Sequence, residues 1–287
     1  MVDLPSIIKK ENIIKVDPEM TLSHALAHLS TSHDAAFVFS DEDKFMGVIN
    51  PYYCLIRSSH PGNAKVEHCL HHPPKVYVDY SLPKVASLLI ESKIHYLPVF
   101  DNKERFMGII SARRILSNLR NLPSFRKTIG DALRFRKKPL TVIYEDETVA
   151  QALALFKSTK LSKLVVINRD MKLKGILSYY DLISFLTQPK NHEGKMERIG
   201  NKIHLFNQHV KNYMKTYVLS LKNNNSLSDA FNLVVSKKIG SVVIVDEERH
   251  PVGIITTRDL LRFYMEGELM RGVSDTFSKM KKLLLNR

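Results

Sequence analysis

The chain has 287 residues, of which 44% are hydrophobic and 25% charged, and its formal net charge is +14. This composition excludes an intrinsically disordered chain, and no apolar run approaches the ~20 residues that cross a bilayer. Two cysteines are too few for a disulfide framework and fit a reducing compartment, so we expect a cytoplasmic protein without a signal peptide or membrane span, whose charge favours anionic partners.

The first predicted unit covers residues 1–60. Thr21 is expected to begin a helix, because a hydroxyl oxygen accepts from a free backbone N–H at a helix start. The apolar runs 35–40 and 47–49, with a polar turn between them, predict a strand pair. A second helix follows the second strand.

The same order of strand, helix, strand, strand and helix recurs in residues 61–121, 122–189 and 190–267. Apolar residues at helical spacing follow the hydroxyl residue, so each first helix buries one face. In the second and fourth units these residues are Leu82, Val85, Ala86, Leu89, Ile90, Leu227, Ala230, Phe231, Val234 and Val235.

Four landmarks recur at nearly constant spacing. A glycine followed by two apolar residues ends each unit's strand pair, seven residues after an apolar run, and a hydroxyl residue precedes it by 26 or 27 residues. The glycines are Gly47, Gly108, Gly175 and Gly253, and the hydroxyl residues are Thr21, Ser81, Thr148 and Ser226. A unit of about 60 residues is marginal alone, so we expect two pairs, divided near residue 122.

The repeat resembles the CBS domain, and two adjacent copies resemble a Bateman module. The signature is glycine, two apolar residues, Ser or Thr, two variable residues, then Asp or Asn. "GILSYYD" at 175–181 and "GIITTRD" at 253–259 match it fully, "GIISARR" at 108–114 keeps only the hydroxyl, and "GVINPYY" at 47–53 keeps neither polar position. The resemblance implies a mixed α/β (α+β) fold of four tandem β-α-β-β-α units paired into two modules.

Two interpretations of the signature acids stay open. In one, Asp181 and Asp259 only complete a capping box with the hydroxyl residue. Against it, Asp is short for that role, and the first two units begin the same helix without an acid. In the other, each carboxylate accepts from two adjacent ribose hydroxyls, while the helix N-terminus beside Ser178 or Thr256 suits phosphate.

The resemblance implies that an adenosine nucleotide such as AMP, ADP or ATP lies in the cleft of the second pair. Asp181 and Asp259 would hold the ribose, and Ser178 and Thr256 would contact ribose or phosphate. The turn into the middle strand, at Lys163 and at Gly240–Ser241, is a further candidate contact. Arg113, Arg114 and Arg258 are candidate phosphate contacts, although Arg114 stands where the signature has an acid, which favours a structural first pair.

Other features suggest no chemistry of their own. His68, Cys69, His71 and His72 match no zinc spacing, so we expect no metal, and no nucleophile elbow, P-loop or HExxH motif is present. The two cysteines, Cys54 and Cys69, are expected to be packed rather than reactive. We therefore expect no enzyme and no cofactor.

The expected function is a non-catalytic regulatory, energy-sensing module that binds an adenosine nucleotide between units three and four and signals to another protein. The alternative is a nucleic-acid-associated protein that binds DNA or RNA through the basic segment 113–138. Residues 268–287 carry a helical apolar stripe, Met270, Val273, Phe277, Met280 and Leu284, which favours a homodimer.

Overall fold

Each unit forms a three-stranded sheet in the computed structural model, which describes residues 3–29, 35–58, 60–92, 94–119, 122–134, 139–183 and 206–268. In every sheet the first strand is parallel to the second, and the second is antiparallel to the third. The first helix of each unit connects the parallel pair. This confirms the predicted mixed α/β fold and its order of elements.

The first two units contain the following elements: α1 (Leu4–Ile7), β1 (Lys15–Val16), α2 (Leu22–Ala27), β2 (Ala36–Phe39), β3 (Phe45–Ile49), the π-helix η1 (Tyr52–Arg57), η2 (Val66–Cys69), β4 (Val76–Tyr77), α3 (Leu82–Ser92), β5 (Tyr96–Phe100), β6 (Phe106–Ser111) and α4 (Ala112–Asn118).

The last two units contain η3 (Pro123–Arg126), α5 (Ile129–Arg134), β7 (Val142–Tyr144), α6 (Val149–Thr159), β8 (Lys163–Ile167), β9 (Leu173–Ser178), η4 (Tyr179–Leu182), η5 (Val210–Asn212), β10 (Ser220–Lys222), α9 (Leu227–Ser236), β11 (Ser241–Val245) and β12 (Pro251–Thr256). Residues 257–268 are helical.

The predicted hydroxyl caps form in the second half of the chain. Thr148 accepts from the backbone N–H of Gln151, and Ser226 accepts from that of Asp229, each within a complete capping box. The prediction for the first unit was wrong in detail: Thr21 occupies the N-cap position of α2, but its side chain makes no capping hydrogen bond. The predicted apolar faces of α3 and α9 are buried or partly buried, which fixes how each helix covers its sheet.

The four hairpins repeat one backbone geometry. Each has a β-bulge near the end of its second strand and one non-glycine residue with positive φ in the turn. These residues are Asp43, Glu104, Met171 and Arg249, with φ of 55°, 60°, 61° and 69°. The repeat inferred from the glycine spacing therefore extends to the turns.

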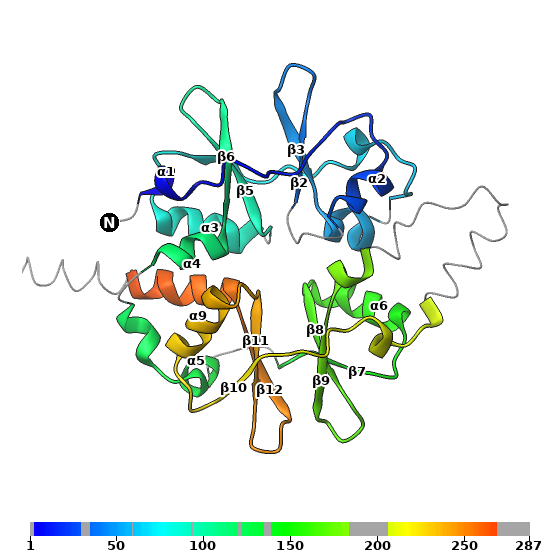
Figure 1. The fold of residues 1–287 in the computed structure, drawn as a ribbon, viewed down its shortest axis with the longest axis vertical. Coiled ribbons are helices and arrows are strands. Elements are labelled where there is room, and N and C mark those ends of the chain that lie inside the picture. The colour runs from blue at the N-terminus through cyan, green and yellow to red at the C-terminus, as the bar shows by residue number, and fades with distance from the viewer. Residues whose placement is uncertain are drawn as a thin grey trace, which may run out of the picture.

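The four units surround a common centre, with the hairpins pointing outward and most helices in a layer across the middle (Figure 1). Helices of unit two face those of unit four, and helices of unit one face those of unit three. Buried residues follow this arrangement: one core cluster joins α3 and α4 to α9, and another joins α2 to α6. The two pairs predicted from the repeat thus stack against each other within one chain.

The signature glycines allow another segment to cross the third strand. The segment before each of three units bridges to its partner's third strand, at Lys9–Ile109, His71–Val48 and Lys215–Ile176. At Gly108, where φ is +139°, a Cβ atom would lie 2.4 Å from the Lys9 carbonyl oxygen. Each pair is therefore held together by exchanged segments.

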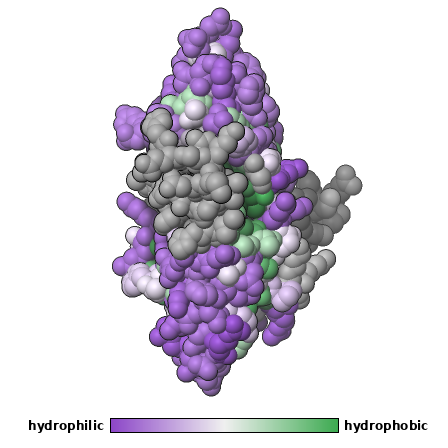
Figure 2. All heavy atoms as spheres, turned by 90° about the vertical axis from the view of Figure 1, so that its right-hand side faces the viewer, coloured by the Kyte–Doolittle hydropathy of each residue, from purple (hydrophilic) through white to green (hydrophobic). Residues whose placement is uncertain are grey.

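Figure 2 shows that the face formed by units one and three is mostly hydrophilic over both hairpin ends, and that its strongest apolar colour lies near the middle. Within the described ranges, no helix is long and apolar enough to cross a membrane. The predicted helical stripe of the tail lies in residues 269–287, outside the described residues.

Candidate functional site

The acid of the third unit lies where β9 ends and η4 begins. Asp181 accepts the backbone N–H of Ser178 through Oδ2 at 2.8 Å, and Ser178 accepts the N–H of Tyr180 at 3.2 Å. The Oδ1 atom of Asp181 lies 3.1 Å from the Nζ atom of Lys215, and the Asp181 side chain is 10% exposed. A carboxylate is thus held at the strand end with one oxygen toward a cation.

The acid of the fourth unit has the same local geometry. Asp259 accepts from the backbone N–H of Thr256 at 2.9 Å and from its hydroxyl at 2.6 Å, and Thr256 accepts the N–H of Asp259 at 3.2 Å. Both signature acids therefore complete capping boxes. The expectation that Asp is too short for this role was wrong, because Oδ2 reaches the backbone N–H in both units.

The first two units confirm that an acid is not needed to begin this helix. Asn50 accepts the N–H of Tyr52 through its side-chain oxygen, and Ser111 accepts the N–H of Arg114. Capping alone therefore does not explain why only two of the four units carry an acid at this position.

The turns into the middle strands bring units three and four together. Lys163 donates from Nζ to the hydroxyl of Ser241 at 3.1 Å. Lys163 lies opposite Ser178 in the β8–β9 register, and Ser241 lies opposite Thr256 in the β11–β12 register. A Cβ atom at Gly240 would lie 2.6 Å from Nζ of Lys163, so the amine packs directly against this glycine. Three candidate residues named from the sequence therefore meet at one point.

Among the described residues, positive groups outnumber acids around this point. Burial lowers the pKa of Lys163 to about 8; Lys215 and Arg113 also lower it, and Asp181 opposes them. The Nε atom of Arg113, which belongs to unit two, is buried and has no hydrogen-bond partner in the described part of the chain. A buried donor without an acceptor is costly, and a bound anion relieves that cost.

Arg258 is a further half-buried positive group of unit four. Burial lowers its pKa, while Tyr179, Asp259 and Tyr53 act in the opposite direction. Tyr179 stacks on Tyr180 with ring centroids 4.7 Å apart. Arg258 thus adds a positive charge close to the acid and tyrosines of these strand ends.

The two neighbouring arginines of unit two have different surroundings. Arg114 donates to the backbone carbonyls of Ile7 at 2.6 Å and Ile8 at 3.4 Å, which holds the N-terminal segment against α4. The positive charge of Arg113 instead lowers the pKa of Lys163 in unit three. The geometry thus favours Arg113 over Arg114 as a phosphate contact.

In unit one, aromatic stacking replaces the acid. Tyr53 stands at the acid position and stacks on His71, with ring centroids 3.7 Å apart and an interplanar angle of 9°. Burial lowers the pKa of His71. Flat rings in contact at this strand end leave no carboxylate to hold a ribose, which agrees with a structural role for the first pair.

The four repeated units match a known protein family. A family model for the CBS domain matches residues 6–55, 66–121, 130–188 and 210–266. The chain belongs to the CBS domain family. Four CBS domains in tandem give the two Bateman modules that the repeat predicted.

The chain is also similar in sequence to several other proteins. Uncharacterized protein MJ1426 from Methanocaldococcus jannaschii is 31% identical over 144 residues, 44% of this chain and 85% of its own length. The gamma-3 subunit of 5′-AMP-activated protein kinase from Sus scrofa is 26% identical over 190 residues, so the match spans 63% of this chain and 36% of that protein.

The fold is shared with a solved structure. Protein MJ1225 from Methanocaldococcus jannaschii, named as a candidate archaeal homologue of g-AMPK, superposes with a TM-score of 0.75 over 92% of this chain and 100% of that chain. The sequence identity is 19%, so this likeness concerns the arrangement of the four CBS domains.

Sequence reasoning missed Lys215. It lies in the segment before the fourth CBS domain, at the position that bridges to the third strand of the partner domain. Lys9 and His71 occupy the equivalent bridging positions, and all three precede the first strand of a CBS domain. Comparing the residues that precede each first strand could therefore have identified Lys215 from the sequence.

The basic segment 113–138 does not form one surface in its described part. Arg113 and Arg114 point to the interior contacts given above, Lys127 lies over the ring of Phe263, and Arg134 pairs with Asp131. Arg120 and residues 136–138 lie outside the described residues.

Both cysteines are packed, as expected: Cys54 is 1% and Cys69 3% exposed, and burial raises the pKa of Cys54 to about 12. His71 stacks on Tyr53. Asp246, Glu248 and His250 lie together in the β11–β12 turn, where Asp246 already accepts from His250 and two backbone N–H groups.

Proposed function

We propose that the chain binds an adenosine nucleotide in the cleft between its third and fourth CBS domains and, without catalysing a reaction, transmits its presence to a partner protein. The observation that carries this proposal is the group of cations around Asp181: Lys163, Lys215 and the unsatisfied Nε atom of Arg113.

The acids match the sugar of such a ligand. A ribose offers two neighbouring hydroxyl donors, and an ionised carboxylate accepts several hydrogen bonds. Asp181 and Asp259 stand at equivalent strand ends of the two domains. Each already accepts its own strand's N–H, which fixes the carboxylate before a ligand arrives.

The cations match the phosphate. Lys163 and Arg113 come from different modules, so a phosphate between them joins the two halves of the chain. Burial makes each charge–phosphate contact stronger than it would be in water. Ser178, Ser241 and Thr256 lie at the same strand ends and supply hydroxyl groups beside it.

The relatives support a regulatory role. The gamma-3 subunit is a named subunit of an AMP-activated kinase, and this chain aligns with about a third of it. We propose by analogy that any regulated activity belongs to a separate chain, and that the partner and a possible homodimer use surfaces outside the nucleotide cleft.

Calorimetric titration with AMP, ADP, ATP and S-adenosylmethionine tests the proposal. We expect at least one adenosine nucleotide to bind, and Asp181→Asn to weaken it about 10- to 100-fold, the value of a charge-assisted hydrogen bond. Asparagine still accepts the N–H of Ser178, so the fold is kept.

Asp170→Asn is the matched control, since Asp170 lies in the exposed β8–β9 turn of the same domain. It should bind as the wild type does. The proposal fails if no adenosine nucleotide binds the intact protein, or if Asp181→Asn and Asp170→Asn have equal affinities.

Binding of DNA or RNA through the basic segment remains the alternative prediction. The described cations of that segment separate into interior contacts and surface ion pairs, which gives it less support. A salt series with DNA and RNA, run beside the nucleotide titration, distinguishes the two functions.

A further inference from the structure

A short segment crosses the seam between the sheets of domains three and four, and both of its ends are held. Lys215 exchanges two backbone hydrogen bonds with Ile176 of β9, at 2.8 and 3.0 Å. The carbonyl of Leu219 accepts the N–H of Val243 in β11 at 3.2 Å. We call residues 215–219 the strap.

One residue of the strap leaves its ring in solvent. Val218 packs against the apolar cluster of the seam with Ile176 and Ile254. Its neighbour Tyr217 is 84% exposed, whereas the other exposed large apolar side chains are 40–46% exposed. Backbone fixed at both ends, an apolar anchor beside it and an exposed ring together leave Tyr217 free to turn without moving the strap.

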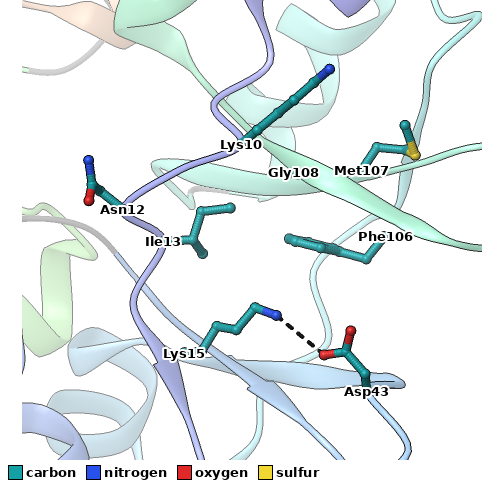
Figure 3. Close-up of a pocket in the computed structure, with 8 residues that line it drawn as sticks. All are labelled: Lys10, Asn12, Ile13, Lys15, Asp43, Phe106, Met107 and Gly108. Atoms are coloured by element: carbon teal, nitrogen blue, oxygen red, sulfur yellow. Dashed lines mark hydrogen bonds and ion pairs between the residues drawn. The ribbon is translucent and has the colours of Figure 1, made fainter.

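In the first module, the segment equivalent to the strap lies beside a pocket. There, Lys9 bridges to Ile109 and the carbonyl of Ile14 accepts the N–H of Phe37, so residues 9–14 are the equivalent segment. Figure 3 shows the pocket of about 400 Å³ beside it, with Ile13 of the segment and Phe106 of β6 pointing toward each other.

The corresponding edge of the second module is closed at its outer end. Counted from the matching hydrogen bonds, Val218 stands where Ile13 does and Leu173 where Phe106 does. Leu173 donates its N–H to the carbonyl of Arg249 at 3.1 Å, which joins the two hairpins. A flat group entering from the Asp181 side therefore meets the strap rather than the hairpin turns.

We propose that Tyr217 is a specificity residue that stacks on the base of the bound nucleotide, selecting ligands with a flat heteroaromatic ring. This rests on the proposed function, because Asp181 and Lys215 place the sugar two residues from Tyr217 along the strap. The phosphate points inward to Lys163 and the base outward along the strap. Tyrosine presents a large face for stacking and loses little side-chain freedom.

Comparing AMP with ribose 5-phosphate isolates the base. Tyr217→Ala should weaken AMP binding roughly 5- to 150-fold and leave ribose 5-phosphate unchanged, because only the stacked ring is lost. Tyr217→Phe should bind AMP as the wild type does. Leu161→Ala, which removes another exposed apolar side chain of the same module, is the matched control and should change neither ligand.

Tyrosine emission gives a second measurement, because the chain has 11 tyrosines and no tryptophan. AMP should quench part of the wild-type emission, and Tyr217→Phe should lose that part while still binding.

The inference is overturned if Tyr217→Ala binds AMP as tightly as the wild type, or loses AMP and ribose 5-phosphate equally. If this happens while Asp181→Asn still loses AMP, the proposed function stands and only the role of Tyr217 falls. If the wild type binds no adenosine nucleotide, both fall together.

Discussion

The carboxylate of Asp181 and the ammonium group of Lys215 lie 3.1 Å apart although 34 residues separate them in the sequence. The pair joins the signature position of one CBS domain to the segment that precedes its partner domain. In the first module the same positions bring Tyr53 onto His71 and Arg114 onto the carbonyls of Ile7 and Ile8. One structural position thus carries an ion pair, a ring stack or a set of backbone contacts, and only the ion pair leaves an acid for a ligand.

Asp259→Ala should have two effects of different size. Nucleotide affinity should fall by about 1.5–3 kcal/mol if the carboxylate holds the ribose. The free energy of unfolding should fall by about 1 kcal/mol, because the capping box with Thr256 is lost. Calorimetry and denaturant unfolding measure the two separately.

Asp229→Ala is the control for this change. Asp229 completes the same capping box with Ser226 at the start of α9. It should cost similar stability without changing affinity. Equal affinity losses in the two variants would mean that Asp259 acts only through the fold.

Lys163 should make both stability and binding depend on pH near 8. Its pKa falls from 10.5 to about 8 on folding, so between these values the unfolded chain binds more protons than the folded one. Stability of the ligand-free protein, measured relative to Lys163→Met, should therefore rise with pH across this window, while the full cost of the buried charge is present below pH 8.

A phosphate favours the charged amine, so nucleotide affinity should fall as the pH rises above 8. Titrations on either side of pH 8, in buffers of different ionisation enthalpy, should show proton uptake for the wild type and none for Lys163→Met. If the nucleotide affinity of both proteins had the same pH dependence, Lys163 would not be a phosphate contact.

The adjacent arginines should separate binding from stability. Arg113→Met should weaken nucleotide binding about 10- to 100-fold, because the Nε–H of Arg113 has no protein acceptor among the described residues and a phosphate could accept it. Arg114→Met should instead lower the free energy of unfolding by about 1–3 kcal/mol, because two carbonyls of the N-terminal segment lose a charged donor. Each variant is the control for the other, and the assignment is wrong if Arg114→Met weakens binding more than Arg113→Met.

Gly108→Ala should destabilise the first module. The new Cβ atom would lie 2.4 Å from the Lys9 carbonyl oxygen at a φ of +139°, so the crossing segment must move. We expect a loss of about 1–3 kcal/mol in thermal or denaturant unfolding. Gly62→Ala places its Cβ 3.4 Å from Ser23 and should change stability little; equal losses at the two glycines would contradict the crossing-segment explanation.

The sequence alone determined the repeat, the order of elements, the apolar faces of α3 and α9 and the caps at Thr148 and Ser226, although not the one expected at Thr21. These features are local: a hydroxyl caps the turn that follows it, and an apolar stripe depends on spacing along one helix. The glycine spacing likewise located all four hairpins, because each hairpin is built from neighbouring residues.

The tertiary structure decided which side chains meet. Lys163 reaches Ser241 and Lys215 reaches Asp181 only because the domains pair and exchange segments. Arg113 and Arg114 differ because successive helical residues point about 100° apart, one toward the centre and one toward the N-terminal segment. Such contacts depend on residues that are distant in the chain, or on the direction in which a side chain points from its helix. A local sequence pattern specifies neither.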